Sequence, residues 1–392
     1  MLKHFAVCLA LCGLISAPAL AADPLQIKLT DDLSRYVAAH ASAEHISAAS
    51  LSISLHGSSR NINAVAGTML FGGGPPITPA TLFQIGSNTK SFTAARILQL
   101  EANGTLSIDQ TLGHWLPQYS AWKDIAIRRL LNMTSGIPTY DDVPAMLRAY
   151  ALNPQRTFTT QQLVAYVYPQ GGDPPSPASG WLYSNTAYIL LQMIIERATG
   201  HSYASEIHNR FLNGLSETYY APSLYPQPIV NRMVAGYFFN TDPGNEGLAP
   251  LLGKDVRYDS MSWAQGAGGI VSTPQDLTRW VRLLYQGSIL GAQQRREMLT
   301  IVSNKTGQPI STTSLSNPHG FGLGVGQMTA ANFGTFWYYE GMTLGYRMLY
   351  AYLPKQDAVI AIGLNSQPPG KQDHIGQLMQ SVYKTLQAAG KL

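Results

Sequence analysis

Alternating apolar and polar positions occur near both ends of the chain and predict β-strands there. The segment from Leu25 to Ala43 has the spacing of an amphipathic helix. Two alternating runs, AASLSISLHG and NINAVAGTM, follow it and are joined by a turn that contains Gly57. Glycine-broken strand patterns return late in the chain at GFGLGVGQM, TFWYYEGM, GYRMLYAYLP and AVIAIGLNS, before a final helix from about Asp373 to Ala388. We therefore expect both ends to contribute to one antiparallel sheet.

Helical periodicity dominates the middle of the chain, from Phe83 to about Arg210. Loops rich in glycine, proline and aspartate interrupt it, and a further helix is expected to begin at Thr273 and Pro274. The pattern predicts an α+β fold, an antiparallel sheet flanked by helices with an inserted all-helical lobe. In a single domain spanning 22–392, we place the sheet lobe at about 22–82 and 266–392 and the helical lobe at about 83–265. We expect the active site at their interface.

Residues 1–21 have the pattern of a secretory signal peptide. Lys3 precedes an apolar run from Phe5 to Ile15, and Ala19-Leu20-Ala21 has the small residues of a cleavage site at its first and last positions. Both cysteines fall in this segment, so a mature chain that begins at Ala22 has none for a disulfide, a thiolate nucleophile or a metal site. No later apolar run reaches the roughly 20 residues that a membrane-spanning helix needs. We expect a secreted protein of the bacterial periplasm, without an integral membrane segment.

Composition narrows the classes of partner and chemistry. The formal net charge is +4, 12% of residues are charged and no basic block stands out, which argues against nucleic acid as a partner. The nine histidines show no H-E-x-x-H spacing, and the chain has no G-x-S-x-G motif. These absences disfavour zinc hydrolases and α/β-hydrolases. We expect neither a metal nor a cofactor.

The segment TLFQIGSNTKSFTAARILQL carries the strongest chemical signal, because Ser87 and Lys90 lie one helical turn apart in it. Both side chains would project from one face of the first turn of a helix that begins at about Ser87. A lysine whose pKa is lowered by burial can accept the proton of a serine hydroxyl. The Ser87 NH would lie at the positive end of the helix, where an oxyanion could form. Taken alone, a serine in this position is usually an N-cap.

A second element, WLYSNTAYILLQMIIERATG, places Tyr183 and Asn185 at the start of an apolar helix. Taken alone, this segment is typical of a tyrosine that packs beside a helix cap. Beside Ser87 and Lys90, a phenol that ionises more easily next to an ammonium could carry a proton between nucleophile and leaving group. Asn185 would then orient the substrate amide and hold Lys90.

Together these segments resemble the serine hydrolases related to class C β-lactamases and D-alanyl-D-alanine carboxypeptidases. FQIGSNTKSFTA is similar to their nucleophile helix, IAIRRLLNMTSGIP to their helix ending in a Thr-Ser-Gly turn, YSNTAYILL to their Tyr-x-Asn element, and GAGGIVSTPQDLTRWV to the segment before their next helix. The resemblance covers about residues 53–364 and implies a β-lactamase/DD-peptidase-like fold. The roles that it implies are nucleophile for Ser87, base for Lys90, proton carrier for Tyr183 and substrate contact for Asn185.

This chain departs from the third element of the family. That element is a basic or imidazole residue followed by a variable residue and glycine. A literal Lys-Thr-Gly begins at Lys305, but it precedes GFGLGVG, whereas the family places its motif on the strand after that segment. We interpret it as a turn. FWYYEGMTLGYR matches instead and aligns Tyr339, Glu340 and Gly341 with the motif as substrate-binding residues. Tyr339 supplies no fixed positive charge and Glu340 would repel an anion, so we do not expect strong binding of a substrate carboxylate.

Backbone chemistry at this strand is unaffected by the altered side chains. The Met342 NH could pair with the Ser87 NH as an oxyanion hole, because that role requires no particular side chain. Arg347 could replace the missing cation, although an arginine on a strand is more often a solvated or paired surface residue. Nothing resembles the deacylating glutamate of class A β-lactamases, so deacylation would use Lys90 and Tyr183.

The sequence therefore predicts an exported serine acyl hydrolase that forms an acyl-Ser87 intermediate. We expect a D-alanyl peptidase or a carboxylesterase. The alternative is a class C β-lactamase, and a third hypothesis is a catalytically silent penicillin-binding or sensor protein. The partner would be a small-molecule or peptide acyl substrate, with a peptidoglycan stem peptide and a β-lactam as candidates.

Overall fold

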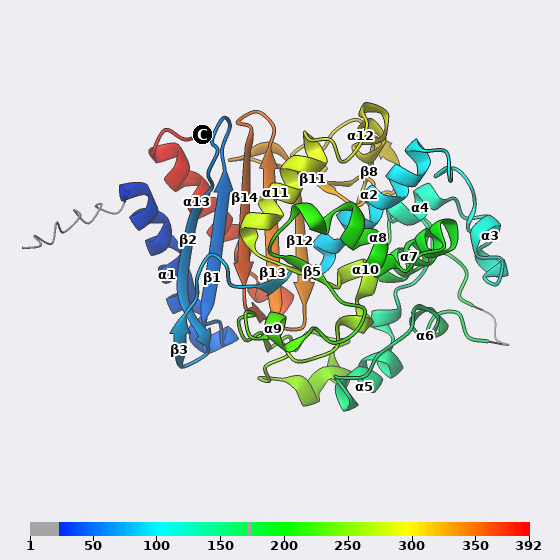
Figure 1. The fold of residues 1–392 in the computed structure, drawn as a ribbon, viewed down its shortest axis with the longest axis horizontal. Coiled ribbons are helices and arrows are strands. Elements are labelled where there is room, and N and C mark those ends of the chain that lie inside the picture. The colour runs from blue at the N-terminus through cyan, green and yellow to red at the C-terminus, as the bar shows by residue number, and fades with distance from the viewer. Residues whose placement is uncertain (1–22, 171–173) are drawn as a thin grey trace, which may run out of the picture.

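The computed structural model describes residues 23–170 and 174–392, which form a ten-stranded antiparallel sheet covered by helices (Figure 1). The strand order is β3-β2-β1-β14-β13-β12-β11-β10-β8-β9. Its strands come from two parts of the described chain: β1 (Ala48–Ser54), β2 (Ile62–Leu70) and β3 (Gly73–Pro76) from the first, and β8 (Ile301–Ser303), β9 (Pro309–Ile310), β10 (His319–Phe321), β11 (Gly326–Ala330), β12 (Gly334–Thr343), β13 (Tyr346–Leu353) and β14 (Ala358–Leu364) from the last. The β1–β14 pair joins the two parts, with Leu51 opposite Ile362.

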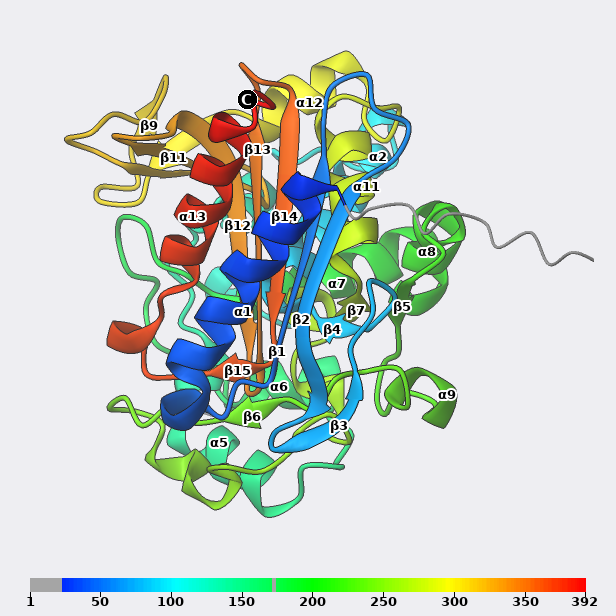
Figure 2. The ribbon, with the colours of Figure 1, turned by 90° about the vertical axis from the view of Figure 1, so that its left-hand side faces the viewer.

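Helices cover both faces of this sheet. On one face, α1 (Pro24–Glu44) and α13 (Ile375–Ala388) lie side by side (Figure 2). Side chains of β14 alternate between the faces: Ile360 and Ile362 pack beneath these two helices, whereas Val359 and Ala361 face the helical part of the molecule. Because both faces are covered, β1 and β14 are buried along their whole length.

The helical part packs around two buried helices, α2 (Thr89–Ala102) and α7 (Asn185–Thr199). The Ser184 side chain caps α7 by accepting a hydrogen bond from the Ala187 NH, and Gly200 ends it in a left-handed conformation. A helix that is apolar on nearly all sides needs partners around it. Partners of α2 or α7 include α3 (Leu112–Trp115), α4 (Ile127–Leu131), α6 (Thr160–Ala165), α8 (Tyr203–Arg210), α10 (Gln265–Gly268) and α12 (Ala292–Met298). The other helices of the chain's middle and later parts are α5 (Pro144–Leu152), α9 (Gln227–Val230) and α11 (Pro274–Tyr285).

Smaller elements connect the two parts. One small sheet has the order β4 (Phe83–Gln84), β7 (Ile270–Ser272), β5 (Thr218–Tyr220), and β6 (Tyr237–Phe238) pairs in parallel with β15 (Ser366–Gln367). The short 3-10 helices are η1 (Gly86–Asn88), η2 (Ser120–Trp122), η3 (Tyr140–Asp142), η4 (Leu212–Gly214), η5 (Glu246–Leu251), η6 (Met261–Trp263) and η7 (Gly370–Gln372). The expected helix at about Ser87 thus begins as the tight turn η1, and the α-helix follows from Thr89.

These elements confirm the predicted α+β class with a large antiparallel sheet and flanking helices. The predicted signal peptide, residues 1–21, lies outside the described residues. Within 23–170 and 174–392, no helix has both the length and the apolar character that crossing a bilayer requires.

Candidate active site

The structure brings Ser87 and Lys90 into contact. Ser87 lies in η1 and Lys90 in the first turn of α2, so the three-residue spacing directs both side chains to the same side. The Lys90 ammonium nitrogen lies 3.0 Å from the Ser87 hydroxyl oxygen. The pairing expected from the sequence is therefore present in the fold.

Lys90 is completely buried and its hydrogen-bond partners are uncharged. Its Nζ donates to the Ser87 hydroxyl, to Asn185 Oδ1 at 2.6 Å and to the Ala267 carbonyl oxygen at 2.7 Å. Burial lowers the pKa of Lys90 to about 7, and the nearby negative charge of Asp141 opposes this shift. Near neutral pH, a large fraction of Lys90 is therefore a free amine that can accept the Ser87 proton.

Tyr183 is the second group on the Ser87 oxygen. Its hydroxyl lies 2.5 Å from Ser87 Oγ, and Lys90 Nζ is 4.9 Å from the centre of its ring. Burial raises the pKa of Tyr183 to about 12, an effect that the hydrogen bond with Ser87 only partly offsets. The expectation of an easily ionised phenol is wrong, because loss of hydration outweighs the hydrogen bonds that lower the pKa of Tyr183. The resting phenol is protonated, which leaves Lys90 as the group that is free to accept a proton near neutral pH.

Asn185 is held from both sides. It accepts the hydrogen bond from Lys90 through Oδ1 and donates through Nδ2 to Asp141 Oδ2 at 2.6 Å. The Thr139 hydroxyl donates to the other oxygen of Asp141 and accepts from the Asn185 NH at 3.0 Å. Sequence reasoning missed Asp141, which lies in η3. The available signal was the acidic pair in the loop SGIPTYDDVP, directly after the Thr-Ser-Gly turn.

The nucleophile turn lies directly against strand β12. Gly86 has a φ of 51°, and a Cβ atom there would lie 2.6 Å from the Met342 carbonyl oxygen. A Cβ atom on Gly341 would lie 2.8 Å from the Ser87 nitrogen. Both positions therefore require glycine. This contact places the Ser87 NH beside the backbone of Gly341 and Met342, as an oxyanion hole formed by Ser87 and Met342 would require.

The side chains of the altered third element lie on opposite faces of β12. Contrary to expectation, Tyr339 does not line the cavity: it is 5% exposed, packs against Phe321 and has its hydroxyl near that of Tyr183. Glu340 does lie on the cavity wall, and its carboxyl group is close to Asp373. Burial and the charge of Asp373 raise the pKa of Glu340 to about 8. Alternation of side chains along the strand causes this division.

Neither candidate cation from the sequence reaches the cavity. Arg347 is completely buried on the far face of the sheet, where it pairs with Glu44 at 2.5 Å and Asp373 at 2.7 Å, so it is neither a substrate contact nor a surface residue. Lys305 lies in the turn between β8 and β9, in which the Gly307 NH donates to the Ser303 carbonyl oxygen. This placement agrees with the interpretation of Lys-Thr-Gly as a turn.

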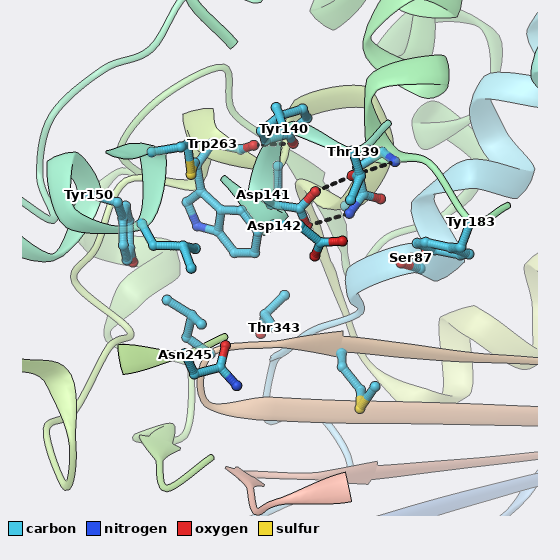
Figure 3. A pocket seen from close by; sticks show the side chains of 18 of the residues that line it. Ser87, Thr139, Tyr140, Asp141, Asp142, Tyr150, Tyr183, Asn245, Trp263 and Thr343 are labelled. Atoms are coloured by element: carbon cyan, nitrogen blue, oxygen red, sulfur yellow. Dashed lines mark hydrogen bonds between the residues drawn. The ribbon is translucent and has the colours of Figure 1, made fainter. Parts of the chain in front are cut away.

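A cavity of about 650 Å³ opens beside Ser87 and Tyr183 (Figure 3). Asp141 and Asp142 lie on one wall of it, across from Asn245 and Thr343. Aromatic rings form much of the remaining wall: Tyr140, Tyr150, Trp181 and Trp263. Of the described residues that line it, none is a lysine, arginine or histidine. In the part of the chain that the structure describes, no three histidine, cysteine, aspartate or glutamate side chains are arranged to hold a metal ion.

Comparison with known proteins identifies the family. A family model described as Beta-lactamase matches residues 33–383. The chain belongs to the beta-lactamase family. This membership confirms the resemblance seen in the sequence and shows that the protein is a serine hydrolase.

Two of the curated relatives of this family member come from Bacillus subtilis and Staphylococcus aureus. A penicillin-binding protein of Bacillus subtilis (strain 168) is 31% identical over 60% of this chain and 52% of its own length. The teichoic acid D-alanine hydrolase of Staphylococcus aureus is 27% identical over 53% of this chain and 47% of its own length. The chain thus spans about half the length of these curated relatives.

Solved structures match nearly the whole fold. A D-stereospecific amidohydrolase from Streptomyces sp. has a TM-score of 0.71 and 25% identity, over 92% of this chain and 97% of that chain. A D-amino acid amidase from Ochrobactrum anthropi SV3, complexed with L-phenylalanine, has a TM-score of 0.78 and 23% identity, over 93% and 99%. A class C beta-lactamase mutant has a TM-score of 0.68 and 19% identity, over 94% and 99%. The last two likenesses concern the fold.

Proposed function

We propose that this serine hydrolase cleaves D-alanyl or related D-aminoacyl amide and ester bonds through an acyl-Ser87 intermediate, as a D-alanyl peptidase or carboxylesterase. The observation that carries the proposal is the convergence of Lys90 Nζ and the Tyr183 hydroxyl on the Ser87 oxygen, at 3.0 and 2.5 Å. A base and a proton carrier on one hydroxyl are what acyl transfer to serine requires.

The proton path follows from the pKa values of these groups. The free amine of Lys90 accepts the Ser87 proton as the oxygen attacks the acyl carbonyl. The protonated phenol of Tyr183 delivers its proton to the leaving amine or alkoxide and regains one from Lys90. The Ser87 and Met342 NH groups face the oxyanion. Water then repeats the sequence, with Lys90 and Tyr183 in the same roles, and releases the acid.

The names of two relatives support the substrate class. The Streptomyces sp. protein is described as a D-stereospecific amidohydrolase and the Staphylococcus aureus protein as a teichoic acid D-alanine hydrolase. We extend to this chain what these names share, a substrate of D configuration.

A class C β-lactamase is the alternative function, and the charge of the cavity argues against it. A penicillin carries a carboxylate that needs a cation, yet the described lining residues include no lysine, arginine or histidine. A catalytically silent binding protein is also disfavoured, because Ser87, Lys90, Tyr183 and Asn185 form one connected hydrogen-bonded set. The proposal includes export to the bacterial periplasm, which is supported by the signal-peptide pattern of residues 1–21.

Intact-mass measurement of the acylated enzyme tests the proposed function. The purified protein is mixed with D-alanine p-nitroanilide, a D-alanine p-nitrophenyl ester or a fluorescent penicillin, and both product release and the mass of the protein are followed. We expect turnover of the D-alanyl substrates, with an adduct that is absent from Ser87→Ala. The exposed Ser59 provides a matched control, and Ser59→Ala should behave as the wild type. Turnover of penicillin alone would favour the β-lactamase.

A further inference from the structure

The catalytic cavity has an excess of negative charge. Asp141 and Asp142 are on its wall, and the described lining residues supply no lysine, arginine or histidine side chain to neutralise them. Lys90 lies beneath the cavity floor, completely buried, and its hydrogen bonds go to Ser87, Asn185 and Ala267 rather than to these carboxylates. A bound ligand is therefore the available source of positive charge for this wall.

The two aspartates differ in how far the protein satisfies them. Asp141 accepts one hydrogen bond on each oxygen, from Asn185 and from Thr139. Asp142 forms no side-chain hydrogen bond or ion pair with the described residues, and partial burial together with the charge of Asp141 raises its pKa. Both side chains lie on the same wall in Figure 3, on the side of the cavity that leads to Ser87. Asp142 thus has its full hydrogen-bonding capacity free for a ligand.

The aromatic lining of the cavity also fits an amine-bearing ligand. The ring of Trp263 lies beside Asp141 and Asp142 in Figure 3, and aromatic faces attract ammonium groups. Met146, Leu147 and Leu248 provide an apolar region for the remainder of the acyl group.

We infer that the cavity selects acyl donors with a free, positively charged amino group next to the scissile carbonyl, and that Asp142, supported by Asp141, binds that group. The inference rests on the proposed function and specifies its substrate class: aminoacyl amides and esters with an unblocked amine, rather than N-acylated peptides, β-lactams or simple alkyl esters. Asp142 is then the specificity-determining residue.

Paired substrates that differ only in the amine test this inference. D-Alanine p-nitroanilide is compared with propionic acid p-nitroanilide, which lacks the amine, and with N-acetyl-D-alanine p-nitroanilide, which blocks it. At pH 7, where the amine is charged, we expect the free amine to be preferred in kcat/KM by about tenfold or more, typical of one charge-assisted hydrogen bond. In Asp142→Asn this preference should fall towards one. Equal rates on the three substrates, or an unchanged preference in Asp142→Asn, would overturn the inference.

A charge-matched control and a binding measurement separate this inference from the proposed function. Asp31 is an exposed acid on α1, so Asp31→Asn should retain both the activity and the preference of the wild type. Calorimetry on Ser87→Ala then compares D-phenylalaninamide with 3-phenylpropanamide, without any need for turnover. We expect only the first probe to bind, and to lose affinity in Ser87→Ala/Asp142→Asn. Turnover that depends on Ser87 but not on the substrate amine would support the proposed function and overturn this inference. Binding that depends on the amine, without acylation of Ser87, would support this inference and overturn the proposed function.

Discussion

Lys90 and Arg347 are both completely buried cations near strand β12, but their surroundings give them opposite properties. Arg347 contacts two carboxylates, Glu44 and Asp373, whose charges raise its pKa despite burial. Lys90 donates to a hydroxyl, an amide and a carbonyl group, so burial dominates and lowers its pKa to about 7. Because two carboxylates pair with it, Arg347 stays charged and has a structural role. Because no carboxylate pairs with Lys90, its pKa is low enough for it to act as a base.

The two faces of β12 show the same difference for acidic groups. Behind the strand, Glu44 and Asp373 are neutralised by Arg347, which ties the last residue of α1 and the start of α13 to the sheet. On the cavity side, Asp142 has no cation from the described residues. Lys90 and Asp142, which form no ion pair with the described residues, thus both lie where substrate chemistry can use them.

Replacement of the base should produce the largest effect. Lys90→Arg retains a positive charge but cannot accept a proton, because arginine remains charged at all relevant pH values. We expect kcat/KM to fall by about 10³-fold, within the usual range for general acid–base groups. Stopped-flow acylation measured by intact mass checks this result. A variant that keeps more than a tenth of wild-type activity would show that Lys90 is not the base.

Loss of the structural cation should instead reduce stability. Arg347→Met leaves Glu44 and Asp373 buried without their partner, which typically costs about 3–5 kcal/mol of unfolding free energy. Urea unfolding measures this cost. The control is Arg128→Met, because Arg128 pairs with Asp109 at the surface, where the two side chains are 34% and 71% exposed, and surface pairs contribute about 1 kcal/mol or less. Equal losses in the two variants would contradict the distinction between a buried and a surface ion pair.

Local spacing predicted the catalytic pair but not its surroundings. Ser87 and Lys90 are three residues apart, so helix geometry alone brings them together. Asp141 meets Asn185 across 44 residues of sequence, and Arg347 meets Glu44 across 303. No local pattern encodes such contacts, because they depend on how the elements pack. This is why the sequence could suggest a cation for the cavity but could not show that it was already paired elsewhere.

The sequence did not predict which side chains of β12 face the cavity, for a different reason. Its run of aromatic residues is apolar on both faces: Trp337 and Tyr339 pack towards the helical part, whereas Phe336 and Tyr338 pack towards α1 and α13. Alternation between apolar and polar positions normally reveals the buried face of a strand. Here both faces are covered, so the sequence located the strand and its glycine but did not show that Tyr339 is buried beside Tyr183 instead of being exposed in the cavity.

The pH dependence of activity should report Lys90 directly. Because the free amine is the active form and the pKa of Lys90 is about 7, kcat/KM should rise with pH and level off about one unit above that value. The measurement should use an ester without an ionisable amine, so that titration of the substrate does not contribute. A rate that is constant between pH 5.5 and 8.5 would contradict a base with this pKa.

The lowered pKa of Lys90 also makes the stability of the protein depend on pH. Between pH 7 and the ordinary lysine pKa of 10.5, the unfolded chain binds a proton at residue 90 that the folded protein lacks. The contribution of Lys90 to stability therefore rises with pH across this window and is smallest below pH 7. Lys90→Met removes the titrating group, so its unfolding free energy should rise less steeply over that range in urea titrations.

The smallest expected effect concerns Asp141, whose negative charge raises the pKa of Lys90 against the dominant effect of burial. Asp141→Asn should lower the pKa of Lys90 further and move the rising limb of the pH profile to lower pH. The amide can still accept a hydrogen bond from Asn185 or Thr139, so the geometry should be largely retained. Asp31→Asn, which removes the same charge far from the cavity, should leave the midpoint where it is. A shift to higher pH in Asp141→Asn would mean that Asp141 acts on Lys90 through the position of Asn185 rather than through its charge.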